Sequence, residues 1–409
     1  MVLLLTPVVA YVSPRFLAFW PGIAGLVLFT LARLMTGRWP RIPHELLLWC
    51  GGIVSLAAVS ALWAIDQEVS TERAVKLAVI LGPSLLLIAA LSHLNTIKFE
   101  VPSQLLFGFC GLVFVLVAAL GVEIKFDYVV YRLLNGLGAL DPVSSSRLNR
   151  SVIALTGLIF IAIGLLYGMK QKLLAAVLPL CCLPLVLWGD SQSMLVGLVL
   201  AMLVYYLFPY RSNIVWRGSM VLLFVMILIA PYLASYLFVN FADTVNSFPI
   251  IGGNQGYGGE RLEIWDAVSR FALQNAFYGF GIEATRSVEA FDTAQIYRQS
   301  VTELHPHNFA VQLWIEFGVI GALLGGAFLT RVLIVVKALP FAAARIALAS
   351  TVFLLVIAAF SYGLWQSWFV GLIVLVYGFN LYMIAFLKQR QQPSVQKESG
   401  DQTQKAAAI

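Results

Sequence analysis

The chain has 409 residues, of which 60% are hydrophobic and only 11% are charged, and its mean hydropathy is +0.89. A soluble domain carries about 25% charged residues, so this composition excludes an ordinary soluble protein and indicates a polytopic membrane protein. The net charge of +6 lies in short connections and the tail, which is typical of membrane orientation and not of nucleic-acid binding.

Twelve apolar runs indicate helices that cross a bilayer, which takes about 20 apolar residues each. The sequence therefore predicts an all-α polytopic membrane domain over residues 1–387, with about 12 transmembrane helices. The polar tail 388–409 is predicted to be disordered. The runs lie near 1–13, 16–36, 46–65, 75–92, 103–121, 151–169, 173–189, 191–208, 218–238, 308–330, 346–365 and 367–387.

Lysine and arginine positions predict the orientation of these helices. With both termini in the cytoplasm, the inward connections hold most of the basic residues, as membrane topology favours. The short outward connections and their flanks hold only Arg15, Arg73 and Lys76. The two long segments, 122–150 and 239–307, then face outward, the second between the ninth and tenth helices. The first apolar run lacks the basic segment and cleavage site of a signal peptide, so we expect it to be retained.

The sequence predicts neither a metal site nor a bound nucleotide. All four cysteines lie inside apolar runs without a CxxC spacing, so no structural disulfide is expected either. No Walker A motif, strand-to-helix GxGxxG or HExxH is present, and no acidic pair is typical of a divalent-metal clamp. Any phosphate chemistry therefore has to depend on arginines.

Two arginines end the outward segment 122–150. Arg147 and Arg150 are three residues apart, so they share a face if the following helix begins early. Guanidinium groups bind phosphate oxygens in a bidentate manner, which favours a lipid-phosphate site. The alternative is that both side chains extend to the lipid headgroups.

The segment 239–307 is too long for a passive connection. After a glycine-rich run, apolar residues recur at helical spacing and predict an amphipathic helix: Leu262, Trp265, Val268, Phe271 and Ala272. Arg261 is expected in the first turn of this helix, just after Gly258 and Gly259. A helix N-terminus with an arginine is a candidate anion site; the alternative is a flexible glycine hinge.

The stretch HPHNFAVQLWIEFGVIG begins at His305 and opens an apolar helix. Its Asn308, Gln312 and Glu316 are four residues apart and share one helix face. A glutamate within a membrane-length apolar run is costly and indicates function. The alternative for Gln312 and Glu316 is hydrogen bonding between helices.

Residues 307–321 fit the pattern H-[N/S/Q], nine residues, then G-x-x-G, which His307, Asn308, Gly318 and Gly321 fill. This pattern resembles the signature of bacterial O-antigen ligases, in a membrane superfamily shared with O-antigen polymerases. An upstream arginine, a tryptophan four residues later and a Gly-x-Gly also resemble that family: Arg261, Trp265, Gly279 and Gly281.

Two features weigh on this resemblance. Many relatives carry a Ser-Arg pair where this chain has SQSM, with Met194 in place of the arginine, so we assign no role to that turn. Polymerases have Arg-x10-Gly patterns in two periplasmic loops. Here a single such spacing joins Arg270 to Gly281.

The resemblance implies transfer of O-antigen polysaccharide from undecaprenyl pyrophosphate to a sugar hydroxyl of lipid A–core, on the periplasmic face of the inner membrane. His307 would be the general base, with His305 as its rival, and Arg147, Arg150 and Arg261 would bind the donor pyrophosphate. A single displacement inverts the anomeric centre without ATP, cofactor or metal. The alternatives are an O-antigen polymerase, a protein O-oligosaccharyltransferase, a polysaccharide transporter and a non-catalytic scaffold.

Overall fold

The computed structural model describes residues 2–96, 101–134, 136, 138, 145–189, 191–247, 257–291, 295–298 and 302–391. Over these residues every regular element is a helix, which confirms the all-α class. In chain order the helices are α1 Val2–Val12, α2 Trp20–Thr36, α3 His44–Ser60, α4 Gln67–Thr96, α5 Ser103–Lys125, α6 Val129–Leu134, α7 Ser145–Gly168, α8 Lys172–Val177, α9 Leu183–Trp188, α10 Gln192–Leu207, α11 Asn213–Leu228, α12 Ala230–Ser247, α13 Tyr257–Ala272, α14 Ala284–Ser287, α15 Phe309–Lys337, α16 Phe341–Phe360 and α17 Ser367–Gln391.

The described helices include six that are long and apolar enough to cross a membrane: α4, α5, α7, α15, α16 and α17. The bent pair α11–α12 makes a seventh if it forms one crossing. Shorter apolar helices, including α1, α2, α3 and α10, overlap other predicted runs. These elements make the chain a multi-pass membrane protein, and the count of about 12 crossings stays a prediction.

Three predicted boundaries are wrong. The run 218–238 is not one helix, because α11 and α12 meet at an angle of 77°, with Pro231 in the first turn of α12. The run 173–189 is interrupted by a 3-10 segment, Leu178–Cys182, that separates α8 from α9. A proline near the start of each new piece explains the interruption, since proline cannot donate a helical hydrogen bond. Finally, α17 continues to Gln391, past the predicted start of the tail at 388.

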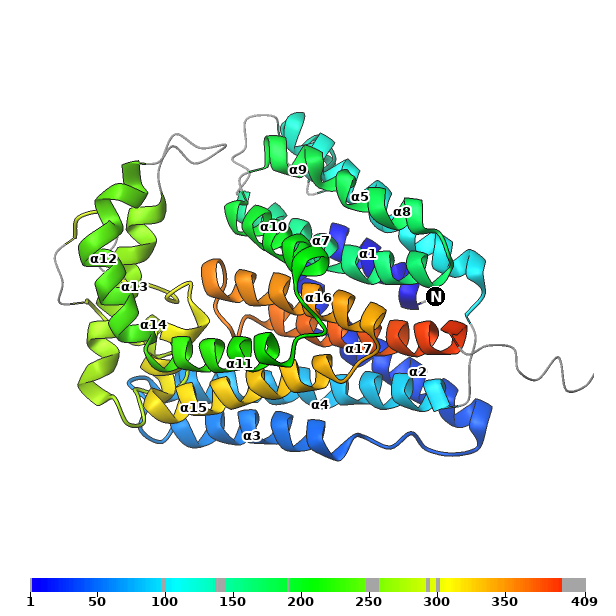
Figure 1. Cartoon of the computed structure of the whole chain (residues 1–409). Helices are drawn as coiled ribbons and strands as arrows, with labels where there is room; N and C mark the ends of the chain where they lie inside the picture. Colours follow the sequence, from blue (N-terminus) through cyan, green and yellow to red (C-terminus); the bar gives the residue numbers. More distant parts are fainter. Residues whose placement is uncertain are drawn as a thin grey trace, which may run out of the picture.

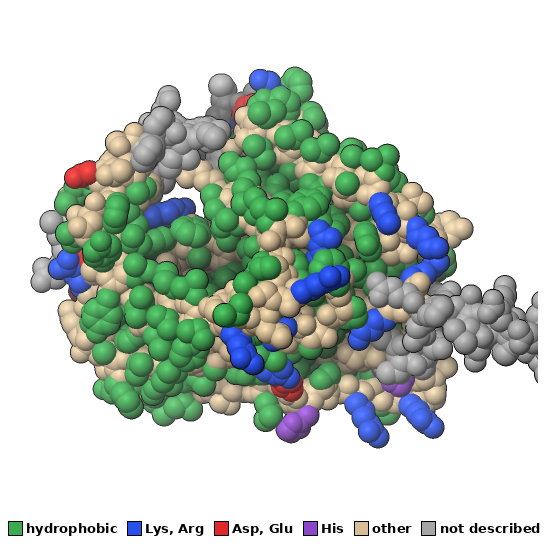
Figure 2. Space-filling view, in the orientation of Figure 1, with side chains coloured by type: hydrophobic (Ala, Val, Ile, Leu, Met, Phe, Trp, Pro, Cys, Tyr) green, Lys and Arg blue, Asp and Glu red, His purple; other side chains and the backbone are tan. Residues whose placement is uncertain are grey.

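The long helices lie side by side and run from one end of the molecule to the other (Figure 1). Helix α7 lies at the centre of the packing, with 94% of its apolar stretch buried inside the protein. The pair α12–α13 stands across one end of the bundle, on the left of Figure 1. Figure 2 shows the surface hollowed between this pair and the helices labelled α10 and α16 in Figure 1, with a Lys or Arg side chain visible inside the hollow.

Helix α15 is broken at Gly318, whose φ of 60° and ψ of −148° are not helical. The break frees backbone groups that the segment after α13 satisfies. Phe280 N donates to Ile315 O at 2.8 Å, Gly281 N donates to Glu316 O at 2.9 Å, and Val319 N donates to Ala276 O at 2.8 Å. Buried backbone groups need such partners, so the break and the segment 276–281 depend on each other.

The motif glycines make this exchange possible. A Cβ on Gly279 would lie 2.5 Å from the carbonyl carbon of Glu316, and one on Gly318 would lie 2.5 Å from the carbonyl carbon of Phe277. Both glycines also have positive φ, 69° and 60°, which only glycine adopts at little cost. The segment 276–281 and the broken part of α15 therefore approach each other backbone to backbone.

Candidate functional site

Four segments meet at the end of the bundle that carries α13. They are the start of α7, the first turns of α13, the segment 302–308 that leads into α15, and the loop 361–366 between α16 and α17. His307 contacts the loop directly, because its Nδ1 lies 2.5 Å from the carbonyl oxygen of Ser361. The positive charge of Arg261 acts on His307, and both Arg150 and Arg261 act on Tyr362. The structure thus gathers residues that lie far apart in the sequence.

His307 is held in one tautomer. A carbonyl oxygen can only accept, so the Nδ1 atom that faces Ser361 carries the proton and Nε2 keeps its lone pair. The residue has a φ of 54°, an uncommon conformation for a side chain other than glycine. Asn308 follows as the N-cap of α15, its side chain accepting from Ala310 N at 3.0 Å and Val311 N at 3.2 Å.

Burial, and next the charge of Arg261, lower the pKa of His307 to about 4, and the hydrogen bond to the Ser361 carbonyl opposes this shift in part. The pKa lies well below 7, so the imidazole is neutral at physiological pH. The arrangement offers an unprotonated Nε2 next to a cation.

His305 lies beside His307, with 4.2 Å between the ring centroids. Its Nε2 is 3.5 Å from the amide nitrogen of Gln366. The oxygen of that amide accepts from Trp368 Nε1 at 2.9 Å, so the amide nitrogen is oriented to donate to His305. Burial, and then the neighbouring His307, lower the pKa of His305 to about 3. Its Nε2 is therefore already engaged as an acceptor.

Arg261 lies in the second turn of α13, since the helix begins at Tyr257; the predicted place in the first turn is wrong. Gly258 and Gly259 are helical and pack closely on α12, so they are not the hinge of the alternative interpretation; Gly252, Gly253 and Gly256 of the same run lie outside the described residues. A Cβ on Gly258 would lie 2.4 Å from a side-chain carbon of Val245. Burial lowers the pKa of Arg261, while the charge of Glu260 opposes the shift. Among the described residues, the buried Nη1 of Arg261 has no hydrogen-bond partner.

Arg147 and Arg150 lie in the first two turns of α7, as predicted for an early helix start, because α7 begins at Ser145. Arg150 is half-buried and acts on the Tyr362 hydroxyl. The side chain of Arg147 lies outside the described residues.

Tyr362 was missed in the sequence because it sits in a short connection that carries no motif. Its ring packs edge-on against Trp368, with 4.9 Å between the centroids. Burial raises its pKa to about 12, and the charges of Arg150 and Arg261 oppose that shift. The phenol is therefore a neutral hydrogen-bond donor within reach of the field of two arginines.

Gln312 and Glu316 lie below the cluster and bond to each other, as their shared face predicts: Gln312 Nε2 donates to Glu316 Oε1 at 2.8 Å. Both point to the loop 361–366. Leu364 N donates to Gln312 Oε1 at 2.8 Å, and Trp365 Nε1 donates to Glu316 Oε2 at 2.5 Å. Gln312 and Glu316 therefore join the start of α15 to the loop 361–366.

The segment 295–298 is fixed to α13 by a buried ion pair. Arg298 Nε lies 3.2 Å from Glu263 Oε1, and the two side chains are 0% and 1% exposed. The same carboxylate accepts from the backbone nitrogens of Ile296, Tyr297 and Arg298. Burial opposes ionisation of Glu263, but these four interactions outweigh it and lower its pKa.

Over the residues that the structure describes, no three His, Cys, Asp or Glu side chains come close enough together to hold a metal ion. The groups at the site are arginines, neutral histidines and a phenol. Their chemistry is anion binding beside a proton acceptor.

A family model described as O-antigen ligase matches residues 174–325, which include α13, both histidines and the motif glycines. Proteins named "Putative polysaccharide ligase" in Rickettsia prowazekii and Rickettsia typhi are 24% and 23% identical to this chain over 236 residues. Each match covers 56% of this chain and 57% of the relative, so the chain spans little more than half the length of the curated relatives it matches. No solved structure matches. The region 174–325, which contains the motif residues, is therefore similar to the O-antigen ligase family and to proteins named as polysaccharide ligases.

Proposed function

We propose that this protein is an O-antigen ligase of the bacterial inner membrane. It transfers O-antigen polysaccharide from undecaprenyl pyrophosphate to a sugar hydroxyl of lipid A–core and so completes lipopolysaccharide. The observation that carries the proposal is the unprotonated Nε2 of His307 beside Arg261, whose buried Nη1 lacks a partner among the described residues. A transfer that releases pyrophosphate needs one acceptor for a proton and one cation for a leaving group.

In this reaction the acceptor hydroxyl oxygen attacks the anomeric carbon of the first donor sugar. The bond from that carbon to the pyrophosphate oxygen breaks, and the hydroxyl proton passes to Nε2 of His307. One displacement inverts the anomeric centre. His307 serves better than His305, because Gln366 already donates to the Nε2 of His305.

The leaving pyrophosphate is stabilised by arginines, with Arg147 as a third cation beside Arg150 and Arg261. Guanidinium groups match phosphate oxygens in a bidentate manner and stay charged when partly desolvated. The Tyr362 hydroxyl adds one neutral donor in the same field. Preorganised donors and cations of this kind are often the largest contribution to catalysis.

Donor binding also strengthens the base. Arg261 is the second-largest cause of the low pKa of His307, after burial. A bound pyrophosphate compensates the charge of Arg261, so it raises the proton affinity of His307 when the donor is present. The base is thereby weak in the empty site and stronger in the complex that reacts.

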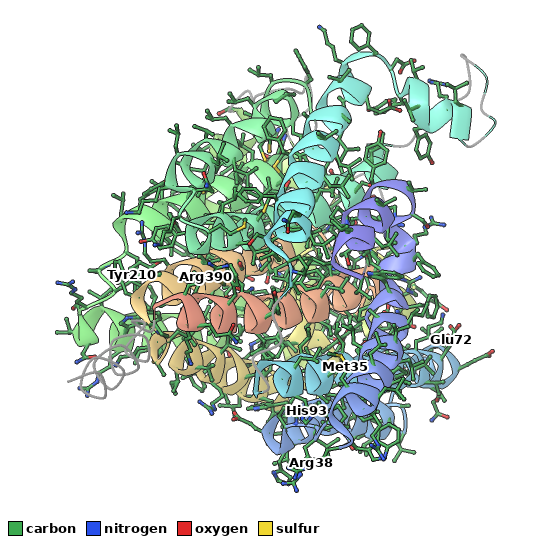
Figure 3. The ribbon with its side chains drawn as sticks, turned by 90° about the vertical axis from the view of Figure 1, so that its right-hand side faces the viewer. Met35, Arg38, Glu72, His93, Tyr210 and Arg390 are labelled. Carbon is green, nitrogen blue, oxygen red and sulfur yellow. The ribbon has the colours of Figure 1, made fainter. Side chains whose placement is uncertain are left out.

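The orientation follows from the basic residues at the opposite end of the bundle. Figure 3 looks onto that end and labels Arg38, His93, Tyr210 and Arg390 there. Lys and Arg concentrate on the cytoplasmic side of membrane proteins. We therefore assign that end to the cytoplasm, together with both termini, and the site beside α13 to the periplasm.

A reconstituted transfer assay tests the proposal. The purified protein receives a polyprenyl-pyrophosphate glycan and lipid A–core in liposomes, with a chelator and without ATP. We expect glycan on lipid A–core, and loss of that product in His307→Gln. His93→Gln is the matched control, because His93 lies at the other end and bonds to Thr36.

Other outcomes favour the alternatives. Longer glycan on the polyprenyl carrier without lipid A–core would make the protein a polymerase, and glycan on an added periplasmic protein would make it an oligosaccharyltransferase. Glycan lipid that crosses the membrane without transfer would make it a transporter. If the folded protein neither transfers, lengthens nor transports the glycan lipid, the result would favour a non-catalytic scaffold.

A further inference from the structure

We infer that Gln312 and Glu316 are positioning residues for His307, and that they act through the loop 361–366. The loop presents the Ser361 carbonyl that keeps the ring proton of His307 on Nδ1 and leaves Nε2 free to accept. The predicted change in kcat rests on the proposed function, whereas the predicted tautomer of His307 does not. The loop also lies outside the region 174–325 that the family model matches.

The loop is tied down at several points around Ser361. The Ser361 hydroxyl bonds to that of Ser193, at the start of α10. Leu364 N donates to Gln312, and Trp365 Nε1 donates to Glu316. Arg73 Nη1 donates to the carbonyl of Trp365 at 2.9 Å. A six-residue loop with these contacts has little freedom to rotate its Ser361 carbonyl.

The orientation of Gln312 is set by Glu316. Glu316 Oε1 accepts from Gln312 Nε2 and, at 3.1 Å, from the backbone nitrogen of Glu283. With its amide nitrogen directed to Glu316, Gln312 must present its oxygen to Leu364 N. Gln312 and Glu316 are only 3% and 1% exposed, so a partner lost here is not replaced by bulk water.

His307 and the pair Gln312 and Glu316 lie on the same helix or directly before it. His307 and the cap Asn308 precede α15, and Gln312 and Glu316 follow on its first two turns, before the break at Gly318. The imidazole and the side chains that hold its carbonyl partner therefore move as one body. The structural alternative is that Gln312 and Glu316 merely join helices, in which case their loss would reduce stability without altering His307.

An exchange of the two side chains separates these alternatives. In Glu316→Gln one accepting oxygen replaces two. If that oxygen takes the Oε1 position, the amide nitrogen faces Trp365 Nε1 and that bond is lost; if the nitrogen takes the Oε1 position, Gln312 must rotate and Leu364 N loses its acceptor, so the loop loses one bond either way. In the double variant Gln312→Glu with Glu316→Gln, the carboxylate now at position 312 accepts from Leu364 N and from the amide nitrogen now at position 316. The oxygen of that amide accepts from Trp365 Nε1, so both loop bonds return and only Glu283 N loses its acceptor. The double variant thus restores the acceptor for the loop with the same two side chains exchanged.

The first readout needs no substrate. Ring ¹⁵N chemical shifts of the four histidines, assigned with His307→Gln, report which nitrogen carries each proton. We expect His307 to be protonated on Nδ1 in the wild type and in the exchange variant, and to populate Nε2–H in Glu316→Gln. An unchanged His307 tautomer in Glu316→Gln, or no recovery in the exchange variant, would overturn the inference.

The second readout is the transfer reaction of folded protein. Glu316→Gln should lower kcat about 10–100-fold, the effect of a misplaced catalytic group, with both KM values changed less than threefold. A lower stability with an unchanged kcat would contradict this expectation. Asn380→Leu on α17 is the control, since Asn380 is a buried polar residue about 20 Å along the helix from Gln366. Gln312→Met provides a second test if Glu316→Gln does not fold. If the wild type lacks ligation, the proposed function fails, while the tautomer measurement still decides the positioning role.

Discussion

Two arginines at the α13 end of the molecule are both buried, but they differ in whether a carboxylate compensates their charge. Arg298 has a side chain with no exposed area and an ion pair with Glu263, which itself binds three backbone nitrogens. Arg261 lies on the same helix as Glu263, but no described carboxylate forms an ion pair with it, and its buried Nη1 has no partner among the described residues. Its neighbours at the site are two neutral histidines and a phenol.

The difference between the two arginines lies in how the buried charge is compensated within the folded chain. Burying a charge is costly unless a partner compensates it. Arg298 has that partner in the folded chain, whereas Arg261 has a lowered pKa, with burial as the first cause. A ligand with phosphate oxygens would compensate this charge, so the burial of Arg261 supports the proposed donor-binding role.

The largest effect is expected for Arg261→Met. Transfer should fall about 10³-fold, or about 4 kcal/mol in activation free energy, while the melting temperature stays equal or rises. In the free protein the pKa of His307 should rise above about 4, because the charge of Arg261 lowers it, but stay below 6.5, because burial remains. An NMR titration of the histidines measures this. A fall in pKa, or full transfer activity, would mean that Arg261 is not the cation of the site.

Arg298→Met should act on stability instead. Removing one partner of a buried pair leaves an uncompensated charge, at a cost of about 3 kcal/mol in the free energy of unfolding. Denaturation in detergent at pH 7 measures it, and the double variant with Glu263→Gln should recover part of the loss. Because the pKa of Glu263 is depressed, the pair contributes stability above the ordinary value of 4.5 and loses it as the pH falls further. The difference in the free energy of unfolding between Arg298→Met and the wild type should therefore become smaller in acid. Transfer activity per folded molecule should hardly change.

The apolar pattern predicted the helical class and the long apolar helices, because a period and a length are local properties of the sequence. The bend between α11 and α12 was missed, since Pro231 near a helix start is equally compatible with a continuous kinked helix. A motif singled out Arg261 and His307 as candidates, whose roles stay predictions, and the early start of α7 was anticipated for Arg150.

The remaining parts of the site depend on tertiary contacts. The sequence of residues 361–366 contains no motif that predicts the contact between the Ser361 carbonyl and His307, or the place of Tyr362 near two arginines. The role of the motif glycines was equally hidden. Gly279 and Gly318 are 39 residues apart in the sequence, and only the folded chain shows that a Cβ on either one would meet the backbone next to the other.

Tyr362→Phe tests whether a neutral donor adds to the arginines. The ring and its packing against Trp368 remain, and only one hydroxyl is removed. We expect transfer to fall about tenfold, near 1.4 kcal/mol, which is typical of one neutral hydrogen bond. The substitution Tyr210→Phe at the opposite end of the bundle is the control, since its hydroxyl bonds to Val204 O. Equal activity of both variants would remove Tyr362 from the site.

The smallest effect is expected for Arg270→Gln, and it completes the contrast among the arginines of this region. Arg270 is 56% exposed and pairs with Asp266 four residues before it on α13. Its partner Asp266 is only 4% exposed, so removal of Arg270 leaves a nearly buried carboxylate without its ion pair, at a cost of about 1–3 kcal/mol in stability, while the effect on transfer stays the smallest. Arg270 also begins the spacing to Gly281 that resembles a polymerase pattern, and a polymerase role predicts a large loss of activity. A change in transfer below twofold would show that Arg270 is a surface residue, whereas a loss comparable to that of Arg261→Met would shift the proposed reaction from ligation toward polymerisation.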